Sequence, residues 1–169
     1  MSTILNTNGT SLNVPKIDNG VKGRFYVITA DWNTDITHTL RDGAIKVLKE
    51  AGISEKSIVS LSVPGTVELV NIASLALKRG NAAAIIVIGC VIRGDTPHFD
   101  YVCRIASEGV AQLNAEGKAP VIFGVLTVDN LSQAQERAGG VLGNKGEEAA
   151  VAAVEMANIH CRFCFSSVQ

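Results

Sequence analysis

The chain has little charge, few aromatic residues and no hydrophobic run long enough to cross a membrane. Charged residues make up 18% of its 169 residues, aromatic residues make up 5%, and the formal net charge is −1. Basic residues form no block, so the electrostatic footprint of a nucleic-acid-binding protein is missing. The longest apolar run, residues 82–92, has 11 residues and includes Gly89, which is too short to span a bilayer. We therefore expect neither a nucleic acid nor a membrane as partner.

Several motifs that would indicate a cofactor or a metal are also missing. The sequence has no dinucleotide glycine fingerprint, no Ser/His/Asp set and no Walker loop, because Gly143–Gly146 lacks both the glycine spacing and the Lys-Ser/Thr pair. Cys161 and Cys164 have C-x-x-C spacing, but no second pair lies at zinc-ribbon distance. We expect no cofactor and no metal. The first 13 residues lack a basic start and an apolar core, which favours a cytoplasmic protein with four free thiols.

What the chain does have is apolar surface in excess for its size. Hydrophobic residues account for 47% of the sequence, and the length suits one domain with a substantial core. Residues 1–22 are polar and rich in turn formers, which predicts an irregular N-terminal arm, and residues 23–169 form a single domain. Partner subunits would cover the surplus apolar surface, so we expect a homo-oligomer.

From residue 24 onward, short apolar runs alternate with amphipathic segments. The expected strands are Arg24–Ala30, Ser57–Val63, Ala83–Cys90 and Pro120–Leu126. The expected helices are Thr37–Ala51, Val67–Lys78, Phe99–Ala115, Leu131–Ala138 and Lys145–Ile159. Alternation with nearly continuous apolar strands predicts a four-stranded parallel sheet that is covered on both faces. Right-handed crossovers then give an α/β fold, a three-layer αβα sandwich of flavodoxin-like type.

Polar residues follow each expected strand. They are Asp31–Asn33, Pro64–Glu68, Arg93–His98 and Thr127–Asp129. Parallel strands place these loops at one edge of the sheet, where open α/β sheets bind ligands. Trp32 is either a core-capping aromatic or a stacking platform for a flat heterocycle. Glu68 is either a solvated charge in the first turn of a helix or an acceptor for ligand hydroxyl groups.

The segment Gly94–Thr96 precedes a helix, and backbone N–H groups at such a place bind phosphate. Asp95 is expected to cap that helix, since a carboxylate repels phosphate. His98 is either a structural residue or a proton-transfer group suited to neutral pH. Arg137 and Lys145 are either two exposed charges or a fork and its support for a phosphoryl group. Together these groups suit two small-molecule substrates, one flat and hydroxylated and one phosphorylated.

These segments resemble those of the lumazine synthase (6,7-dimethyl-8-ribityllumazine synthase) family, which acts in riboflavin biosynthesis. The matching segments are Val63–Glu68, Gly89–Val102, Pro120–Thr127 and Arg137–Gly139 with Gly143–Gly146. The resemblance implies a transferase that joins 5-amino-6-(D-ribitylamino)uracil to 3,4-dihydroxy-2-butanone 4-phosphate and releases phosphate and water. Trp32 replaces a frequent Phe, and Asp95 replaces a small residue of some members.

The resemblance also implies the roles of single residues. His98 resembles the general acid/base of the family. The residues that resemble the ribitylaminouracil site are Trp32, Thr66, Val67, Glu68, Cys90, Val91, Ile92 and Phe123. Asp95, Thr96 and Arg137 resemble the site for butanone phosphate, with Lys145 in support. Phe123 and Arg137 come from the neighbouring subunit.

Assembly follows from the same resemblance. It implies a homopentamer, and the short segment Gly139–Gly143 favours a shell of 60 subunits, with the arm pairing with a neighbour's sheet. Riboflavin synthase is a candidate partner. Three alternatives remain: a non-catalytic flavin- or lumazine-binding homologue, a shell protein without turnover, and the enzyme that condenses two lumazines.

Overall fold

The computed structural model describes residues 12–165. In this range the elements alternate as the sequence predicts. They are β1 (Arg24–Ala30), α1 (Thr34–Glu50), the 3-10 helix η1 (Glu55–Ser57), β2 (Ile58–Val63), α2 (Glu68–Lys78), β3 (Ala82–Ile92), α3 (His98–Ala115), β4 (Val121–Val128), α4 (Leu131–Arg137), β5 (Ala138–Gly140), β6 (Gly143–Asn144) and α5 (Lys145–Phe165).

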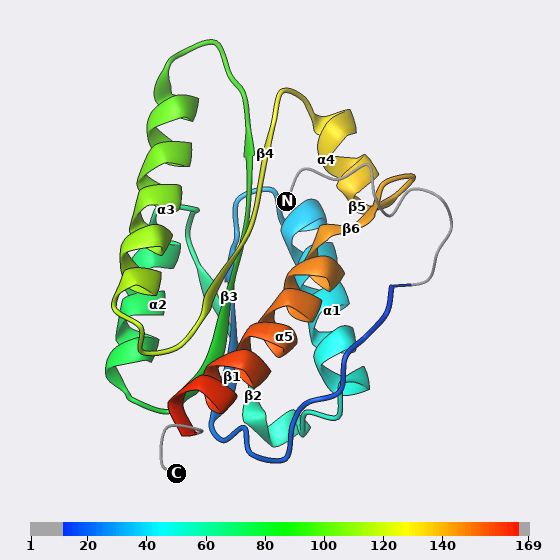
Figure 1. Cartoon of the computed structure of the whole chain (residues 1–169). Helices are drawn as coiled ribbons and strands as arrows, with labels where there is room; N and C mark the ends of the chain where they lie inside the picture. The colour runs from blue at the N-terminus through cyan, green and yellow to red at the C-terminus, as the bar shows by residue number, and fades with distance from the viewer. Residues whose placement is uncertain (1–11, 166–169) are drawn as a thin grey trace.

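The main sheet has the order β2-β1-β3-β4, and every neighbouring pair is parallel. Figure 1 shows α2 and α3 on one face of this sheet and α1 and α5 on the other. The predicted three-layer, flavodoxin-like α/β fold is therefore confirmed. Because all four strands run the same way, the loops after them meet at one edge of the sheet.

The two central strands explain why the sheet is buried on both faces. In β3, Ile85, Ile86, Val87 and Ile88 are fully buried, and they alternate between two apolar clusters. Ile86 and Ile88 pack in the cluster that includes α1 and α5, whereas Ile85 and Val87 pack in the cluster that includes α2 and α3. A strand with both faces covered must be apolar at every position, which is the pattern in the sequence.

The structure extends or adds several elements relative to the sequence prediction. β3 continues to Ile92 and β4 to Val128 because the two strands stay in register to these residues. α5 continues to Phe165 rather than ending at Ile159. The expected linker Gly139–Gly143 overlaps a small antiparallel hairpin, β5–β6. Gly139 and Gly143 have positive φ angles, which glycine adopts at little cost, and this tight turn has no apolar alternation to reveal it.

The described part of the arm, residues 12–22, lies on its own subunit. Leu12, Val14 and Ile17 pack against the α1–α5 side of the core, and Asn158 on α5 binds the backbone of Lys16 and Asp18. Residues 1–11 lie outside the described part, so the pairing of the arm with a neighbouring subunit stays a prediction. In the range 12–165, no helix is long and apolar enough to cross a membrane.

Candidate active site

A pocket of about 580 Å³ lies at the carboxyl edge of the sheet. Its walls come from the loops after β1 and β2, the end of β3 and the first turns of α3. The lining residues are Trp32, Asn33, Gly65, Thr66, Val67, Glu68, Cys90, Val91, Ile92, His98 and Val102. The structure thus brings together the predicted catalytic residue and every residue predicted for ribitylaminouracil except Phe123.

Trp32 stands at the pocket with its indole largely in solvent. It is 71% exposed, so it is not a core-capping aromatic. Gly65 lies beside it, and a Cβ on Gly65 would come 3.5 Å from Cδ1 of Trp32 and 2.9 Å from Oε2 of Glu68. Glu68, the first residue of α2, is exposed as well. The absence of a side chain at Gly65 therefore leaves an open corner between an aromatic plate and a carboxylate.

Asn33 is a pocket residue to which the sequence analysis assigned no role, although it lies among the polar residues after the first strand. Its φ angle is +60°, in the left-handed region that Asn tolerates better than most residues. Its Nδ2 donates to the carbonyl oxygen of Cys90 at 2.9 Å, and its backbone oxygen accepts from Ile36 and Thr37. Asn33 therefore holds the Trp32 loop against the end of β3 and begins α1.

The β2–α2 loop forms one wall of the pocket. Thr66 is only 6% exposed, and its Oγ1 lies 2.9 Å from where a Cβ on Gly89 would stand. Gly89, in the middle of β3, thus lets the Thr66 loop approach the sheet backbone closely. Such close approach is the usual reason for a glycine inside a buried strand.

Cys90 is buried at the pocket wall, and its thiol is not activated. Burial raises the pKa of Cys90 to about 11, because a thiolate loses its hydration there. At neutral pH the thiol of Cys90 is protonated, and it forms a weakly polar part of the pocket wall. It suits contact with a flat ring rather than nucleophilic attack.

His98 is the first residue of α3, is exposed and lines the pocket. Asp95 and Thr96 are exposed in the loop before it, next to the pocket but not in its lining. The prediction that Asp95 caps α3 is wrong: Pro97 occupies the N-cap position, and α3 has no side-chain cap. Thr96 and Pro97 stand between Asp95 and the first residue of α3, so the carboxylate of Asp95 is out of capping position. The carboxylate of Asp95 therefore does not accept from the first-turn amides of α3.

Phe123, Arg137 and Lys145 are not part of the pocket within this single subunit. Phe123 is half-buried on the edge strand β4. Arg137 is the last residue of α4, and its guanidinium donates to the carbonyl oxygen of Gln133 in the same helix. Lys145 forms a 2.6 Å ion pair with Glu148, and both side chains are mostly buried. The placement of Phe123 and Arg137 away from the pocket is compatible with their predicted contribution to a neighbouring subunit.

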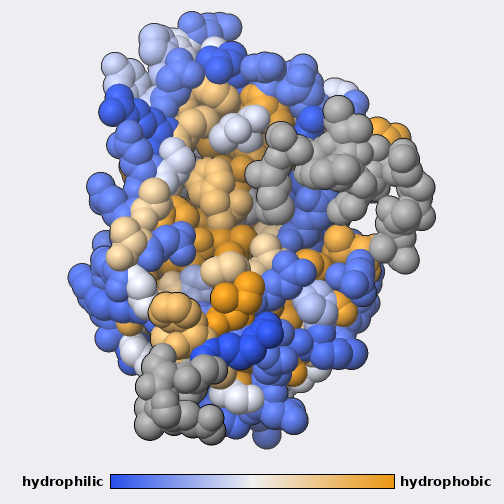
Figure 2. Space-filling model, in the orientation of Figure 1, coloured by the Kyte–Doolittle hydropathy of each residue, from blue (hydrophilic) through white to orange (hydrophobic). Residues whose placement is uncertain are grey.

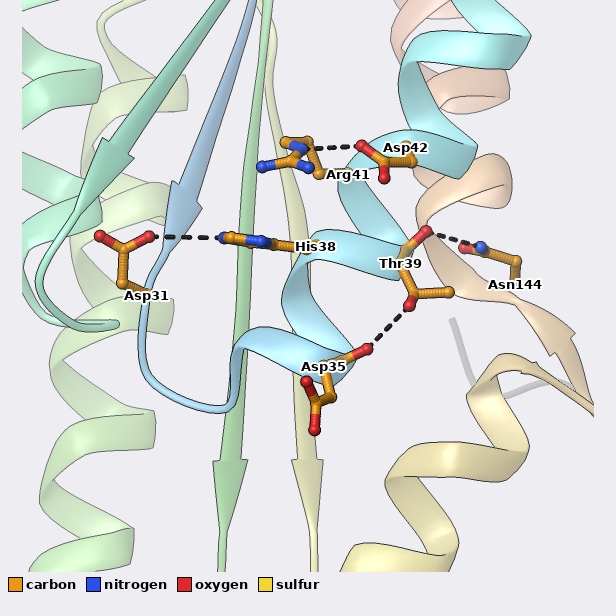
Figure 3. Close-up of polar contacts among 7 residues, drawn as sticks. All are labelled: Asp31, Asp35, His38, Thr39, Arg41, Asp42 and Asn144. Atoms are coloured by element: carbon orange, nitrogen blue, oxygen red, sulfur yellow. Dashed lines mark hydrogen bonds and ion pairs between the residues drawn. The ribbon is translucent and has the colours of Figure 1, made fainter.

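The Gly143–Gly146 motif has a structural role at the start of α5. Oδ1 of Asn144 accepts from the backbone N–H groups of Gly146 and Glu147, and its Nδ2 donates to the carbonyl oxygen of Thr39 on α1 (Figure 3). Gly146 rests directly on the backbone of Leu40, where a Cβ would collide with the carbonyl oxygen. The motif therefore caps α5 and fastens it to α1.

Figure 3 also shows a contact between α1 and the loop that carries Trp32. Nε2 of His38 faces Oδ1 of Asp31 at 3.6 Å, a distance for an ion pair when the imidazole is protonated. The backbone N–H of Asp31 donates to the carbonyl oxygen of Val63 at the end of β2. The loop after β1 is thus held from several sides.

The comparison with known proteins agrees with this geometry. The family model described as 6,7-dimethyl-8-ribityllumazine synthase matches residues 22–160. A protein of that description from Phocaeicola vulgatus is 49% identical over 140 residues, covering 83% of each chain. A second, from Bacteroides fragilis, is 50% identical and covers 79% of this chain and 93% of its own. A third, from Cytophaga hutchinsonii, is 45% identical and covers 89% and 93%. The chain belongs to the 6,7-dimethyl-8-ribityllumazine synthase family.

Proposed function

We propose that the pocket condenses 5-amino-6-(D-ribitylamino)uracil with 3,4-dihydroxy-2-butanone 4-phosphate to give 6,7-dimethyl-8-ribityllumazine, in riboflavin biosynthesis. The observation that carries the proposal is the convergence of Trp32, Glu68 and His98 on one pocket, in a chain of this family. The chain is a transferase, and the proposed setting is the cytoplasm.

The flat substrate suits the wall formed by Trp32 and the end of β3. The exposed indole offers a face for stacking on the pyrimidine, and the protonated thiol of Cys90 with Val91 and Ile92 offers an apolar, close-fitting side. Glu68 accepts hydrogen bonds from hydroxyl groups of the ribityl chain, with Thr66 and Val67 beside it. Stacking at one end and hydroxyl recognition at the other orient the reactive amine.

The phosphorylated substrate is proposed to lie at the start of α3. The first-turn amides, the hydroxyl of Thr96 and the positive end of the helix dipole attract phosphate. Arg137 of an adjoining subunit completes this site with a planar guanidinium that matches phosphate geometry. Asp95 is part of the same loop, and it contributes its backbone rather than its carboxylate. Lys145 supports the site through the packing of α5 rather than by contact with phosphate.

The chemistry needs positioning and proton transfer. The amine attacks the ketone and water leaves to give an imine, and phosphate is then eliminated. The ribitylamino nitrogen finally attacks the carbonyl group formed after the elimination, and ring closure releases a second water. Much of the acceleration comes from holding two reactants in contact. His98 moves protons in these steps, while the helix amides and Arg137 stabilise the charge of the departing phosphate.

Homopentamers and a 60-subunit shell are the proposed assemblies. The edge strand β4 is incompletely covered, and Figure 2 shows apolar residues gathered over it, between α3 and α5. Exposed apolar side chains on these two helices are Tyr101, Ile105, Met156, Ile159 and Phe163. A patch of this kind marks a protein interface, and a second subunit there would bring Phe123 of β4 into a shared site. Riboflavin synthase stays a candidate partner of the assembled shell.

A two-substrate assay tests the proposal. The purified chain, mixed with both substrates, is expected to produce the fluorescent lumazine and release phosphate. His98→Ala should slow turnover by about 100-fold without abolishing it, which is the size of a general acid/base effect. If the wild-type chain assembles but makes no lumazine, it is a binding or shell-forming homologue. If His98→Ala keeps the wild-type rate from pH 6 to 8, the proton-transfer role is wrong.

A further inference from the structure

Arg93 is a charged residue at the start of the β3–α3 loop, and the proposed mechanism does not use it. Its side chain reaches two carboxylates from different elements. Nε donates to Oδ1 of Asp129, after β4, at 3.1 Å, and Nη1 donates to Oδ1 of Asp100, in the first turn of α3, at 3.3 Å. The guanidinium also lies 4.0 Å from the centre of the Phe99 ring, within the range of a cation–π contact.

These contacts bracket the loop Gly94–Pro97, which precedes the first turn of α3. The backbone N–H of Arg93 donates to the carbonyl oxygen of Val128, so both its backbone and its side chain are tied to the end of β4. At the other end of the loop, Asp100 and Phe99 belong to α3 and contact the same guanidinium. One side chain thus joins the residue before the loop to the helix after it.

The loop has little else to hold it. Within residues 12–165, no side-chain hydrogen bond or ion pair forms at Asp95 or Thr96, and α3 has no side-chain cap. A Cβ on Gly94 would meet nothing within 4 Å, so packing does not restrain the loop there. The conformation of the loop that is proposed to bind phosphate therefore depends strongly on the contacts of Arg93.

We propose that Arg93 is a positioning residue: it pins the β3–α3 loop to β4 and α3 so that the loop amides are set for the phosphate of the substrate. The proposal does not assign the guanidinium to the phosphate, because two carboxylates already balance its charge and its face lies over the Phe99 ring. The geometry needs a planar fork with two separated donors, which lysine does not supply. The inference rests on the proposed function only for what the loop binds.

The alternative role for Arg93 is direct electrostatic attraction of the phosphate. Substitution of Asp129 separates the two. Asp129→Asn keeps the charge of Arg93 and removes a competing negative charge, so direct attraction predicts a lower KM for butanone phosphate. Positioning predicts a higher KM, because the fork loses one of its two ionic partners.

The experiment compares Arg93→Gln, Arg93→Lys and Asp129→Asn with the wild-type chain. Arg104→Gln is the matched control, since it removes an exposed ion pair with Glu108 from the same helix α3. We expect the KM for butanone phosphate to rise about tenfold in the three test variants, a loss of the size caused by small misplacement of a binding group. The KM for the pyrimidine should stay within about twofold, as it should for Arg104→Gln. Arg93→Lys should not restore the wild-type value.

Hydrogen exchange gives a readout that does not depend on turnover. Amides between Gly94 and Phe99 should exchange faster in Arg93→Gln and Asp129→Asn, and those of the central strand β3 should not. Unchanged exchange in the loop, or a lower KM in Asp129→Asn, would overturn the positioning role. Faster exchange in a chain that makes no lumazine would leave the positioning role intact and refute only the proposed function.

Discussion

Cys90 shows how burial changes the chemistry of a side chain at this pocket. The thiol sits at the wall where ribitylaminouracil is proposed to bind, yet burial raises its pKa to about 11. Its thiolate fraction at pH 8 is therefore very small, and thiolate is the form that reacts. Cys164, by contrast, is exposed near the end of α5, 3.6 Å from Nε2 of His160.

Alkylation should discriminate between these two thiols. In the native protein at pH 8, iodoacetamide is expected to modify Cys164 at least about tenfold faster than Cys90, because Cys164 is exposed, whereas Cys90 is buried and burial raises its pKa. Peptide mass spectrometry over time measures the two rates. In urea the difference should vanish, which is the control for intrinsic reactivity. Modification of Cys90 in the folded protein at the rate of Cys164 would contradict the buried, protonated thiol.

Trp32 is the single tryptophan of the chain, so its role has a direct optical test. Trp32→Ala should raise the KM for the pyrimidine by about tenfold or more, since loss of one aromatic stacking partner typically costs 1–3 kcal/mol. Trp32→Phe keeps a ring and should cost much less. In the wild-type chain, the pyrimidine alone should quench the indole fluorescence. Equal KM values for the three proteins would rule out stacking.

At the residue scale, the sequence predicted the pocket wall well because each strand ends where a polar loop begins. Trp32 lies in such a loop, Glu68 and His98 begin the helices that follow two others, and parallel strands bring the three residues together. The N-cap of α3 was predicted wrongly, since Asp95 fits the capping preference but Pro97 takes that position. The role of Asn33 depends on a φ angle and on a long-range bond to Cys90, and neither has a local sequence pattern.

At the scale of elements, the contact between α1 and α5 stabilises two segments of the proposed site. Asn144 caps α5 and also holds α1, and Gly146 allows the two helices to touch through the backbone at Leu40. α1 begins directly after the Trp32 loop, and α5 follows the segment that carries Arg137. The junction thus fixes the relative position of two parts of the proposed site.

Asn144→Ala should lower the free energy of unfolding by about 1–2 kcal/mol, because it removes the N-cap of a long helix and a bond to α1. Asn144→Asp is the matched control: its carboxylate still caps α5 but cannot donate to Thr39, so its loss should be smaller. Urea unfolding followed by circular dichroism measures both, at equal protein concentration. Equal losses in the two variants would show that capping contributes little here.

The bounds of elements were predictable where apolar periodicity is strong and less so where tertiary pairing decides. β1 matches the prediction at both ends, because it is an apolar run between polar neighbours. β3 and β4 are longer than predicted because each extends the other through Ile92 and Val128. The β5–β6 hairpin is built on glycines with positive φ angles, and a run of glycines is equally typical of a linker.

At the scale of the whole molecule, one subunit does not bring all the proposed site residues together. The pocket holds His98 but neither Phe123 nor Arg137. The edge strand β4 and the exposed apolar residues of α3 and α5 offer a surface for the subunit that would supply them. We therefore expect binding of butanone phosphate to require assembly, since its proposed guanidinium partner comes from the adjoining chain.

Mixed assemblies of two impaired variants test this shared site most directly. His98→Ala lacks the proton-transfer group, and Arg137→Ala lacks the phosphate fork, so each alone should be slow at a butanone phosphate concentration below the wild-type KM. In randomly mixed oligomers about a quarter of the sites combine an intact His98 with an intact Arg137 from the next subunit. Co-expressed variants with different tags, purified through both, should therefore recover about a quarter of the wild-type rate per site. A rate equal to the mean of the two separate variants would show that each subunit supplies both groups to its own pocket.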